Sequence, residues 1–154
     1  MTHALGRTVD ELTVGDRASV TKVVSETDIY LYVGLSGDLN PLYIDESYAA
    51  AHRFRGRVAP GALTTGLVIA VISTKLPGPG AILEREDLHF TAPVRPGDTI
   101  TAFAEVAEVI PSRGRVRLHT VCKNQDGVVV LEGEVTVLPP PRVRTERSGE
   151  RSTP

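Results

Sequence analysis

One segment near the middle of the chain, GALTTGLVIAVISTKL from Gly61 to Leu76, limits the possible folds more than any other. Its length and composition predict a helix of about four turns. Because its side chains are small or apolar on nearly every face, this helix has no side suited to water. The remainder of the chain must therefore cover it on most sides.

Strand-forming segments make up most of that remainder. β-Branched residues and period-two alternation predict one strand before the long helix and four after it. The predicted strands span residues 18–24, 82–90, 99–110, 115–123 and 128–138. Two short helices are predicted between the first strand and the long helix. One starts after the N-cap Ser25 and stops at Gly37, and the other covers residues 46–52.

This order of elements predicts an α+β protein with a hotdog fold, in which a curved antiparallel sheet wraps around one long central helix. Residues 1–138 form a single domain in this interpretation. Residues 139–154 are rich in Pro, Arg, Ser and Glu, so we expect a disordered tail there. One helix cannot cover the sheet completely, and the edge strands are open to pairing. We therefore expect a homodimer or a higher homo-oligomer.

The overall composition argues against several classes of function. A net charge of −2 and the absence of Trp argue against a nucleic-acid-binding surface. The longest apolar run, at residues 67–72, is too short to span a membrane. The N-terminus lacks the basic and apolar regions of a secretory signal, and one cysteine, Cys122, cannot form a disulfide within the chain. A cytoplasmic protein with no membrane partner is the expectation.

Polar side chains gather in SGDLNPLYID, residues 36–45, directly after the first predicted helix. Asp38 and Asn40 both favour turns, and Pro41 restricts the residue before it to an extended backbone. A structural turn is the simpler interpretation of this pattern taken alone. A second feature of the chain raises the weight of a chemical role for Asp38.

That feature is the sequence Val-Ala-Pro-Gly at residues 58–61, which leads into the long helix. The first N–H groups of a helix lack intrahelical partners and lie at the positive end of its dipole. Since Gly61 lets a ligand come close, this end could hold a carbonyl oxygen that becomes negative, as an oxyanion hole does. A carboxylate opposite such a site is the minimum needed to add water to a polarised double bond. Ordinary helix entry is the alternative explanation.

Taken together, the Ser-Gly-Asp-x-Asn-Pro motif, the Pro60-Gly61 pair and the later LHFTAPVRPGDTI resemble the MaoC-like dehydratases, the (R)-specific enoyl-CoA hydratase family. The resemblance extends from about residue 20 to residue 138. It implies the hotdog fold and acyl thioesters of coenzyme A or acyl carrier protein as substrates. It also implies reversible hydration of a trans-2-enoyl thioester, without a metal or a redox cofactor.

The resemblance further implies roles for individual residues. Asp38 would activate the water, and the amide of Gly61 would polarise the thioester carbonyl. Asn40 would shape the loop and orient the catalytic pair. The acyl chain would lie along the central helix from Ala62 to Val71. Pro60, where close family members often have a histidine, is also assigned to substrate binding.

Tyr43 departs from the family, because it occupies the position of a catalytic histidine. A free tyrosine has a pKa near 10, against about 6.5 for histidine, so it is a poor base at neutral pH. Tyr43 could hold the water while Asp38 alone serves as the base. It could instead face away from a site that only binds acyl thioesters, or pack in the core of a protein without activity. The first alternative has the most weight, because the other residues of the motif are present.

Two other functions stay open on the sequence alone. The chain could be a non-catalytic or weakly active subunit that binds acyl thioesters, which the missing histidine would favour. A hotdog thioesterase shares the architecture, but the Ser-Gly-Asp-x-Asn-Pro motif argues against it.

Other reactive side chains have ordinary explanations. Cys122 falls on the apolar side of its strand, which indicates a core residue rather than a nucleophile. The histidines are not spaced as metal ligands, and a surface or packing role is expected for His3, His52, His89 and His119. Four basic residues could meet the phosphates of coenzyme A, although such a cluster is usually a solvated face: Arg53, Arg55, Arg57 and Lys75.

Overall fold

The computed structural model describes residues 5–142, which contain one sheet, four α-helices and two short 3-10 helices. The elements are η1 Val9–Glu11, β1 Arg17–Val23, α1 Glu26–Ser36, α2 Pro41–Ile44, α3 Glu46–Ala51, α4 Gly61–Thr74, β2 Ile82–Phe90, β3 Thr99–Ile110, η2 Pro111–Arg113, β4 Arg115–Lys123 and β5 Val129–Leu138. All the predicted strands and helices are present. The long helix ends two residues earlier than predicted, at Thr74 rather than Leu76.

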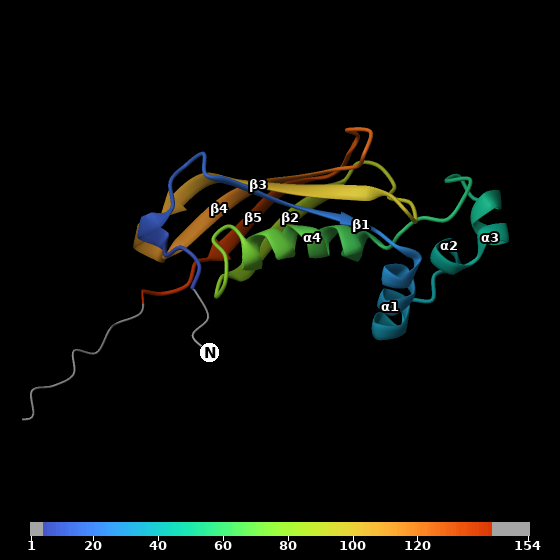
Figure 1. Cartoon of the computed structure of the whole chain (residues 1–154), viewed down its shortest axis with the longest axis horizontal. Helices are drawn as coiled ribbons and strands as arrows, with labels where there is room; N and C mark the ends of the chain where they lie inside the picture. Colours follow the sequence, from blue (N-terminus) through green and yellow to red (C-terminus); the bar gives the residue numbers. More distant parts are fainter. Residues whose placement is uncertain (1–4, 143–154) are drawn as a thin grey trace, which may run out of the picture.

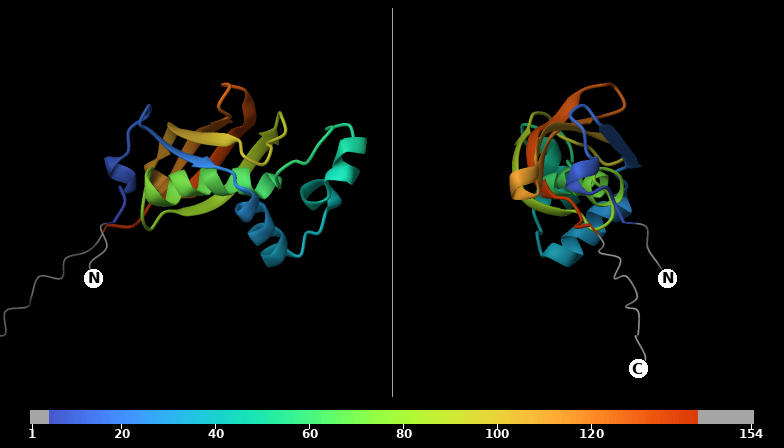
Figure 2. Two further views of the ribbon diagram at one scale, coloured as in Figure 1. Left: turned by 45° about the vertical axis from the view of Figure 1, so that its right-hand side comes forward. Right: turned by 90° about the vertical axis from the view of Figure 1, so that its left-hand side faces the viewer.

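The five strands pair antiparallel in the order β1-β3-β4-β5-β2, and α4 lies along the inner face of the curved sheet (Figure 1; Figure 2). The predicted alternation in β4 is confirmed, because its four inward side chains are fully buried: Val116, Leu118, Thr120 and Cys122. They belong to the core that also contains Val68, Val71 and Ile72 of α4. The predicted hotdog architecture is therefore confirmed.

Helix α1 has the ends that its sequence predicts. Ser25 and Asp28 form a capping box, in which the Ser25 Oγ accepts a hydrogen bond from the Asp28 N–H (3.2 Å). Gly37 ends the helix in the left-handed conformation, with φ at 73°. Ile29 and Val33 face the core, so α1 is held against the body of the protein on one side.

Helices α2 and α3 lie beyond the end of α4, at the end of the molecule opposite the N-terminal segment (Figure 1). We call residues 38–57, which contain both helices, the arm, and we call the sheet together with α4 the body. Within α2 and α3 only Ala49 is buried. The arm therefore depends on polar contacts with the body as well as on side-chain packing.

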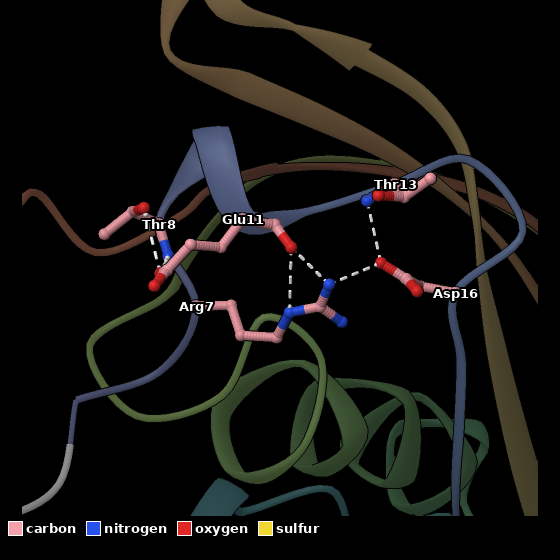
Figure 3. Close-up of polar contacts among 5 residues, drawn as sticks. All are labelled: Arg7, Thr8, Glu11, Thr13 and Asp16. Atoms are coloured by element: carbon pink, nitrogen blue, oxygen red, sulfur yellow. Dashed lines mark hydrogen bonds and ion pairs between the residues drawn. The ribbon is translucent and has the colours of Figure 1, made fainter.

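The segment before β1 lies at the end of the molecule opposite the arm (Figure 1). Polar side chains and backbone groups within this segment bind one another (Figure 3). The guanidinium of Arg7 donates to the Glu11 carbonyl oxygen and to the Asp16 carboxylate, the latter at 2.7 Å. The Thr13 N–H donates to the same carboxylate at 2.7 Å. Thr8 donates to the Glu11 carboxylate through its N–H at 2.8 Å.

Several predictions lie partly or wholly outside the part of the chain that the structure describes. The prediction for His3 is among these. So is most of the predicted tail, since residues 143–154 are not described. Strands β1 and β2 form the two edges of the sheet, and assembly through an edge stays a prediction. Among residues 5–142, no helix combines the length and the apolar character that crossing a bilayer requires.

Candidate active site

Asp38 lies in a tight turn between the end of α1 and the arm's first helix. Its N–H donates to Ser36 Oγ (3.1 Å), and its Oδ1 accepts from the Asn40 N–H (3.3 Å). These are the local side-chain bonds by which Asp and Ser stabilise turns. The residue is partly exposed, so its carboxylate keeps access to solvent.

Asn40 and Pro41 start helix α2. The Asn40 Oδ1 accepts a hydrogen bond from the Leu42 N–H (3.0 Å), and Pro41 takes the first helical position. This single-turn helix was not predicted, because four residues are too few to show a helical period and an Asn-Pro start is equally typical of a turn. Asn40 therefore caps α2, and its role in orienting the catalytic pair stays a prediction.

Tyr43 projects from α2 toward the core and packs against the main hydrophobic cluster. Burial raises the pKa of its phenol above the usual value of 10, and the negative charge of Asp38 raises it further. Tyr32 acts in the same direction, whereas a hydrogen bond with the Asn40 side chain opposes the rise. At neutral pH Tyr43 is therefore protonated, and its hydroxyl can both donate and accept a hydrogen bond.

Gly61 is the first residue of α4, and Pro60 is its N-cap without a side-chain cap. The N–H groups of the first turn have no intrahelical acceptors. The ring of Phe90, at the end of β2, lies directly against the Gly61 Cα. The contact with Phe90 gives a second reason for glycine here, one that the sequence did not reveal.

A cavity of about 580 Å³ opens between the arm, the start of α4 and the segment after β2. Asn40, Tyr43 and Gly61 all line it, so the structure brings these three predicted site residues together. The remaining lining residues are Leu42, Arg53, Phe54, Val58, Ala59, Thr64, Phe90, Thr91, Ala92, Pro93 and Val94. Most of this wall is apolar, with a few polar side chains among the lining residues, as in many small-molecule sites.

Three other predicted residues do not line this cavity. Asp38 lies outside the lining, although its charge reaches Tyr43. Pro60 is buried directly before Gly61, and its carbonyl accepts from the Leu63 N–H (3.0 Å). Ala62 lines a separate hollow, beside α1. Within α4 only Gly61 and Thr64 reach the cavity, so it does not follow the helix to Val71 as the sequence suggested.

Two arginines near the cavity have roles that the sequence did not predict. Arg57 turns inward and binds Glu26 and the carbonyl of Tyr43, so it is not free to meet a phosphate. Arg95 binds the carbonyl oxygens of Arg57 (3.0 Å) and Phe54 (2.6 Å). Lys75 lies just past the far end of α4, away from the cavity. No local sequence signal marks these contacts, because each joins residues far apart in the chain.

The histidines that the structure describes and the cysteine do not line the cavity. His52 stacks on Phe54, with ring centroids 5.3 Å apart, and its buried Nδ1 has no hydrogen-bond partner. His89 and His119 are exposed on the sheet. Burial raises the pKa of the Cys122 thiol to about 12, which makes this thiol a poor nucleophile. Within residues 5–142 no group of three or more His, Cys, Asp or Glu side chains could hold a metal ion.

Comparisons with known proteins show what this chain is similar to in sequence and in fold. Residues 10–128 match the family model described as MaoC like domain. The chain is 46% identical over 133 residues to the (R)-specific enoyl-CoA hydratase of Rhodospirillum rubrum, covering 86% of this chain and 92% of the relative. It is 43% identical over 131 residues to the 3-hydroxybutyryl-CoA dehydratase of Methylorubrum extorquens, covering 85% and 83%. The solved structure of the unliganded R-hydratase PhaJ1 from Pseudomonas aeruginosa superposes with a TM-score of 0.83 at 40% identity, covering 89% of this chain and 88% of that one.

Proposed function

This chain belongs to the MaoC-like domain family, and from that premise we propose that it is an (R)-specific enoyl-CoA hydratase. Such an enzyme adds water reversibly to a trans-2-enoyl thioester and, in the opposite direction, dehydrates a 3-hydroxyacyl thioester. The observation that carries this proposal is the meeting of Asn40, Tyr43 and Gly61 around one cavity at a helix N-terminus. The hydratase and dehydratase names of the two relatives described above support it.

In the proposed reaction, Asp38 takes a proton from water while the water oxygen bonds to C3 of the enoyl group. The π electrons of the C2–C3 double bond move toward the thioester, and negative charge grows on its carbonyl oxygen. The Gly61 N–H donates to that oxygen, and the helix dipole favours the same charge. Protonation of C2 then completes the 3-hydroxyacyl thioester.

Tyr43 takes the place of a second basic group in this proposal. Its phenol stays protonated at neutral pH, so it acts as a donor and acceptor and not as a base. We place the reacting water between this hydroxyl and the Asp38 carboxylate. The phenol can pass its proton to C2 and regain one from Asp38, which balances the protons of the cycle.

The test uses purified chain with crotonyl-CoA, whose enoyl-thioester absorbance is lost as the double bond is hydrated. Asp38→Asn should lower kcat by about a hundredfold or more, the range that general base catalysis supplies. Asp87→Asn is the matched control, because Asp87 is an exposed carboxylate on β2 with a side chain that is 68% exposed. Equal rates for wild type and Asp38→Asn would remove Asp38 as the base.

A second candidate is a subunit that binds acyl thioesters without turning them over. Tyr43 in the position of the family's histidine favours it, since loss of one member of a catalytic pair commonly costs several orders of magnitude. Calorimetric binding of crotonyl-CoA together with an unchanged enoyl absorbance over hours would support this candidate. Fast hydration by the isolated chain would exclude it.

We also propose that the chain assembles as a homodimer or a higher homo-oligomer. The edge strands β1 and β2 and a row of exposed leucines beside the site are the available surfaces: Leu31, Leu35 and Leu39 are 66%, 91% and 69% exposed. A single monomer mass in multi-angle light scattering at micromolar concentration would contradict the assembly. A cytoplasmic location stays a prediction from the sequence.

A further inference from the structure

Arg57 is the last residue of the arm and lies behind the cavity. Its side chain is only 13% exposed and does not line the cavity. The Nε atom donates to the carbonyl oxygen of Tyr43 at 2.7 Å. The two terminal nitrogens donate to the two carboxylate oxygens of Glu26, at 3.0 and 2.7 Å. This paired geometry is the strongest that a guanidinium offers, so Arg57 connects α1 to the back of α2.

The hydrogen bond from Arg57 gives a partner to a carbonyl group of helix α2, which is too short to supply partners for all its own carbonyl groups. The carbonyl of Leu42 accepts from the Val58 N–H (3.1 Å), and the next carbonyl, that of Tyr43, accepts from Arg57. Two consecutive residues thus bind two consecutive carbonyl groups at the C-terminal end of α2. A cation suits this end of a helix. The backbone of Tyr43 is therefore held from behind while its phenol lines the cavity in front.

Arg57 is itself held in place from several sides. Arg95 donates to its carbonyl oxygen at 3.0 Å, and the ring of Tyr30 lies 5.8 Å from its guanidinium carbon. Arg95 is in turn fixed by its own N–H, which donates to Asp98 at 2.8 Å. The contact between Arg57 and Tyr43 is consequently one part of a connected network that joins α1, the arm and the segment before β3. A network of this kind can fix a side chain within the narrow tolerance that catalysis needs.

We propose that Arg57 is a positioning residue, which holds the backbone of Tyr43 and thereby fixes its phenol in the cavity. The inference rests on the hydratase function proposed above. It adds a residue outside the motifs that marked the site, and it explains how a tyrosine on a one-turn helix can be placed reproducibly.

The kinetic test uses three variants with crotonyl-CoA: Arg57→Met, Tyr43→Phe and the double variant. Arg57→Met keeps an unbranched apolar stem but removes the guanidinium and all its donors. We expect kcat to fall by about tenfold to a hundredfold, the cost of a displacement of roughly 1 Å, with KM changing less than about threefold. In the Tyr43→Phe background the same substitution should cost less than about twofold, because no hydroxyl remains to be misplaced. An equal loss in both backgrounds would overturn the proposal.

Arg57→Lys and Arg17→Met complete the series. The first variant retains the positive charge but not the paired geometry, so kcat should recover only in part, which a purely electrostatic role would not predict. Arg17→Met removes another ion-paired arginine, on β1, whose side chain is 75% exposed. It should leave kcat within about twofold of the wild-type value. If Arg57→Met does not fold, as judged by circular dichroism, Arg57→Lys carries the same comparison between the two Tyr43 backgrounds.

An alkaline titration followed by tyrosinate absorbance tests the same inference without any turnover. Tyr43 should ionise above pH 10 in the wild type, and Tyr43→Phe identifies its step. Since burial is the main cause of the raised pKa, Arg57→Met should move that step down toward 10 as α2 loosens. If the wild type shows no hydration at all, the proposed function fails, and this titration still decides the role of Arg57. An unchanged ionisation of Tyr43 would then overturn it.

Discussion

The ring of Phe90 lies so close to Gly61 that a Cβ atom added to the glycine would be 2.9 Å from the ring's Cε1 atom. Phe90 ends β2 and Gly61 begins α4. The edge of the Phe90 ring therefore packs where the end of this strand meets the start of the helix. Gly61 thus serves both the proposed oxyanion site and the packing of this corner.

Substituting alanine for Gly61 separates these two roles. The ring is 58% exposed and lines the open cavity, so it can shift into that space, and we expect Gly61→Ala to cost only about 1 kcal/mol in the free energy of unfolding. The displaced ring would narrow the cavity, and kcat/KM for crotonyl-CoA should fall by about tenfold or more. The double variant Gly61→Ala, Phe90→Ala should regain much of that activity. A double variant as slow as Gly61→Ala, with Phe90→Ala itself fast, would mean that the methyl group blocks the substrate directly.

The raised pKa of Tyr43 gives the rate a characteristic dependence on pH. Its phenol stays neutral until the pH exceeds 10, so no change in Tyr43 accompanies a pH increase from about 7 to 9. Tyr43→His replaces it with a group whose reference pKa is about 6.5, so a new titration step should enter the profile of kcat between about pH 6 and 7. Stopped-flow hydration of crotonyl-CoA in a constant-ionic-strength buffer measures both profiles. If the wild-type profile of kcat also shows a titration step near pH 6.5, the step comes from a group other than residue 43 and the prediction is wrong.

Asp28 makes stability depend on acid. Hydrogen bonds from Lys22 and from the Ser25 backbone and hydroxyl lower the pKa of its carboxyl from 3.8 to about 2. Because the folded pKa lies below the unfolded one, the stabilisation is complete above about pH 4 and is lost as the pH falls toward 2. Asp28→Asn should lower the free energy of unfolding at pH 7 by about 1 kcal/mol and flatten its decline between about pH 4 and 2. Urea unfolding at pH 7, 4 and 2.5 checks this, and an equally steep decline in the variant would assign the acid sensitivity elsewhere.

Thr64 offers a test of where the acyl chain lies. It is 2% exposed, lies one turn after Gly61 and lines the cavity wall. A leucine here would occupy space that a longer acyl chain needs, and one misplaced methylene commonly costs about 1–3 kcal/mol. Thr64→Leu should therefore lower kcat/KM for hexenoyl-CoA relative to crotonyl-CoA by about tenfold or more. Thr64→Val, which is nearly isosteric, is the control and should change that ratio little. A chain-length ratio that is the same in all three proteins would place the acyl group elsewhere.

Strong periodic patterns made most of the fold predictable from the sequence. The apolar character of α4 predicts a helix that is covered on most sides. The alternation in β4 identifies which side of that strand is buried, and the structure agrees at Val116 and Leu118. The caps Ser25 and Gly37 are equally local signals, because a helix end is decided by residues within one turn of it.

The parts of the site that escaped prediction depend on contacts between distant residues. Arg57 binds Tyr43, which lies 14 positions away, and Glu26, which lies 31 positions away. An arginine among arginines in RFRGR gives no sign that one of them turns inward. The contact of Phe90 with Gly61 and the placement of Ala62 in a different hollow likewise follow from how α4 meets the sheet.

The arm has a consequence for the dynamics of the molecule. Its helices bury one residue, Ala49, and its ties to the rest of the molecule include the ion pair of Arg57 with Glu26 and the hydrogen bond from Arg95 to the Phe54 carbonyl oxygen. The amide hydrogens of α2 and α3 should therefore exchange with deuterium through local opening, while those of α4 and the central strands should exchange only with global unfolding. Two different free energies would then describe the protein. The free energy of unfolding of the body sets the melting temperature. The free energy of local opening of the arm sets the fraction of molecules whose catalytic groups are assembled at any moment.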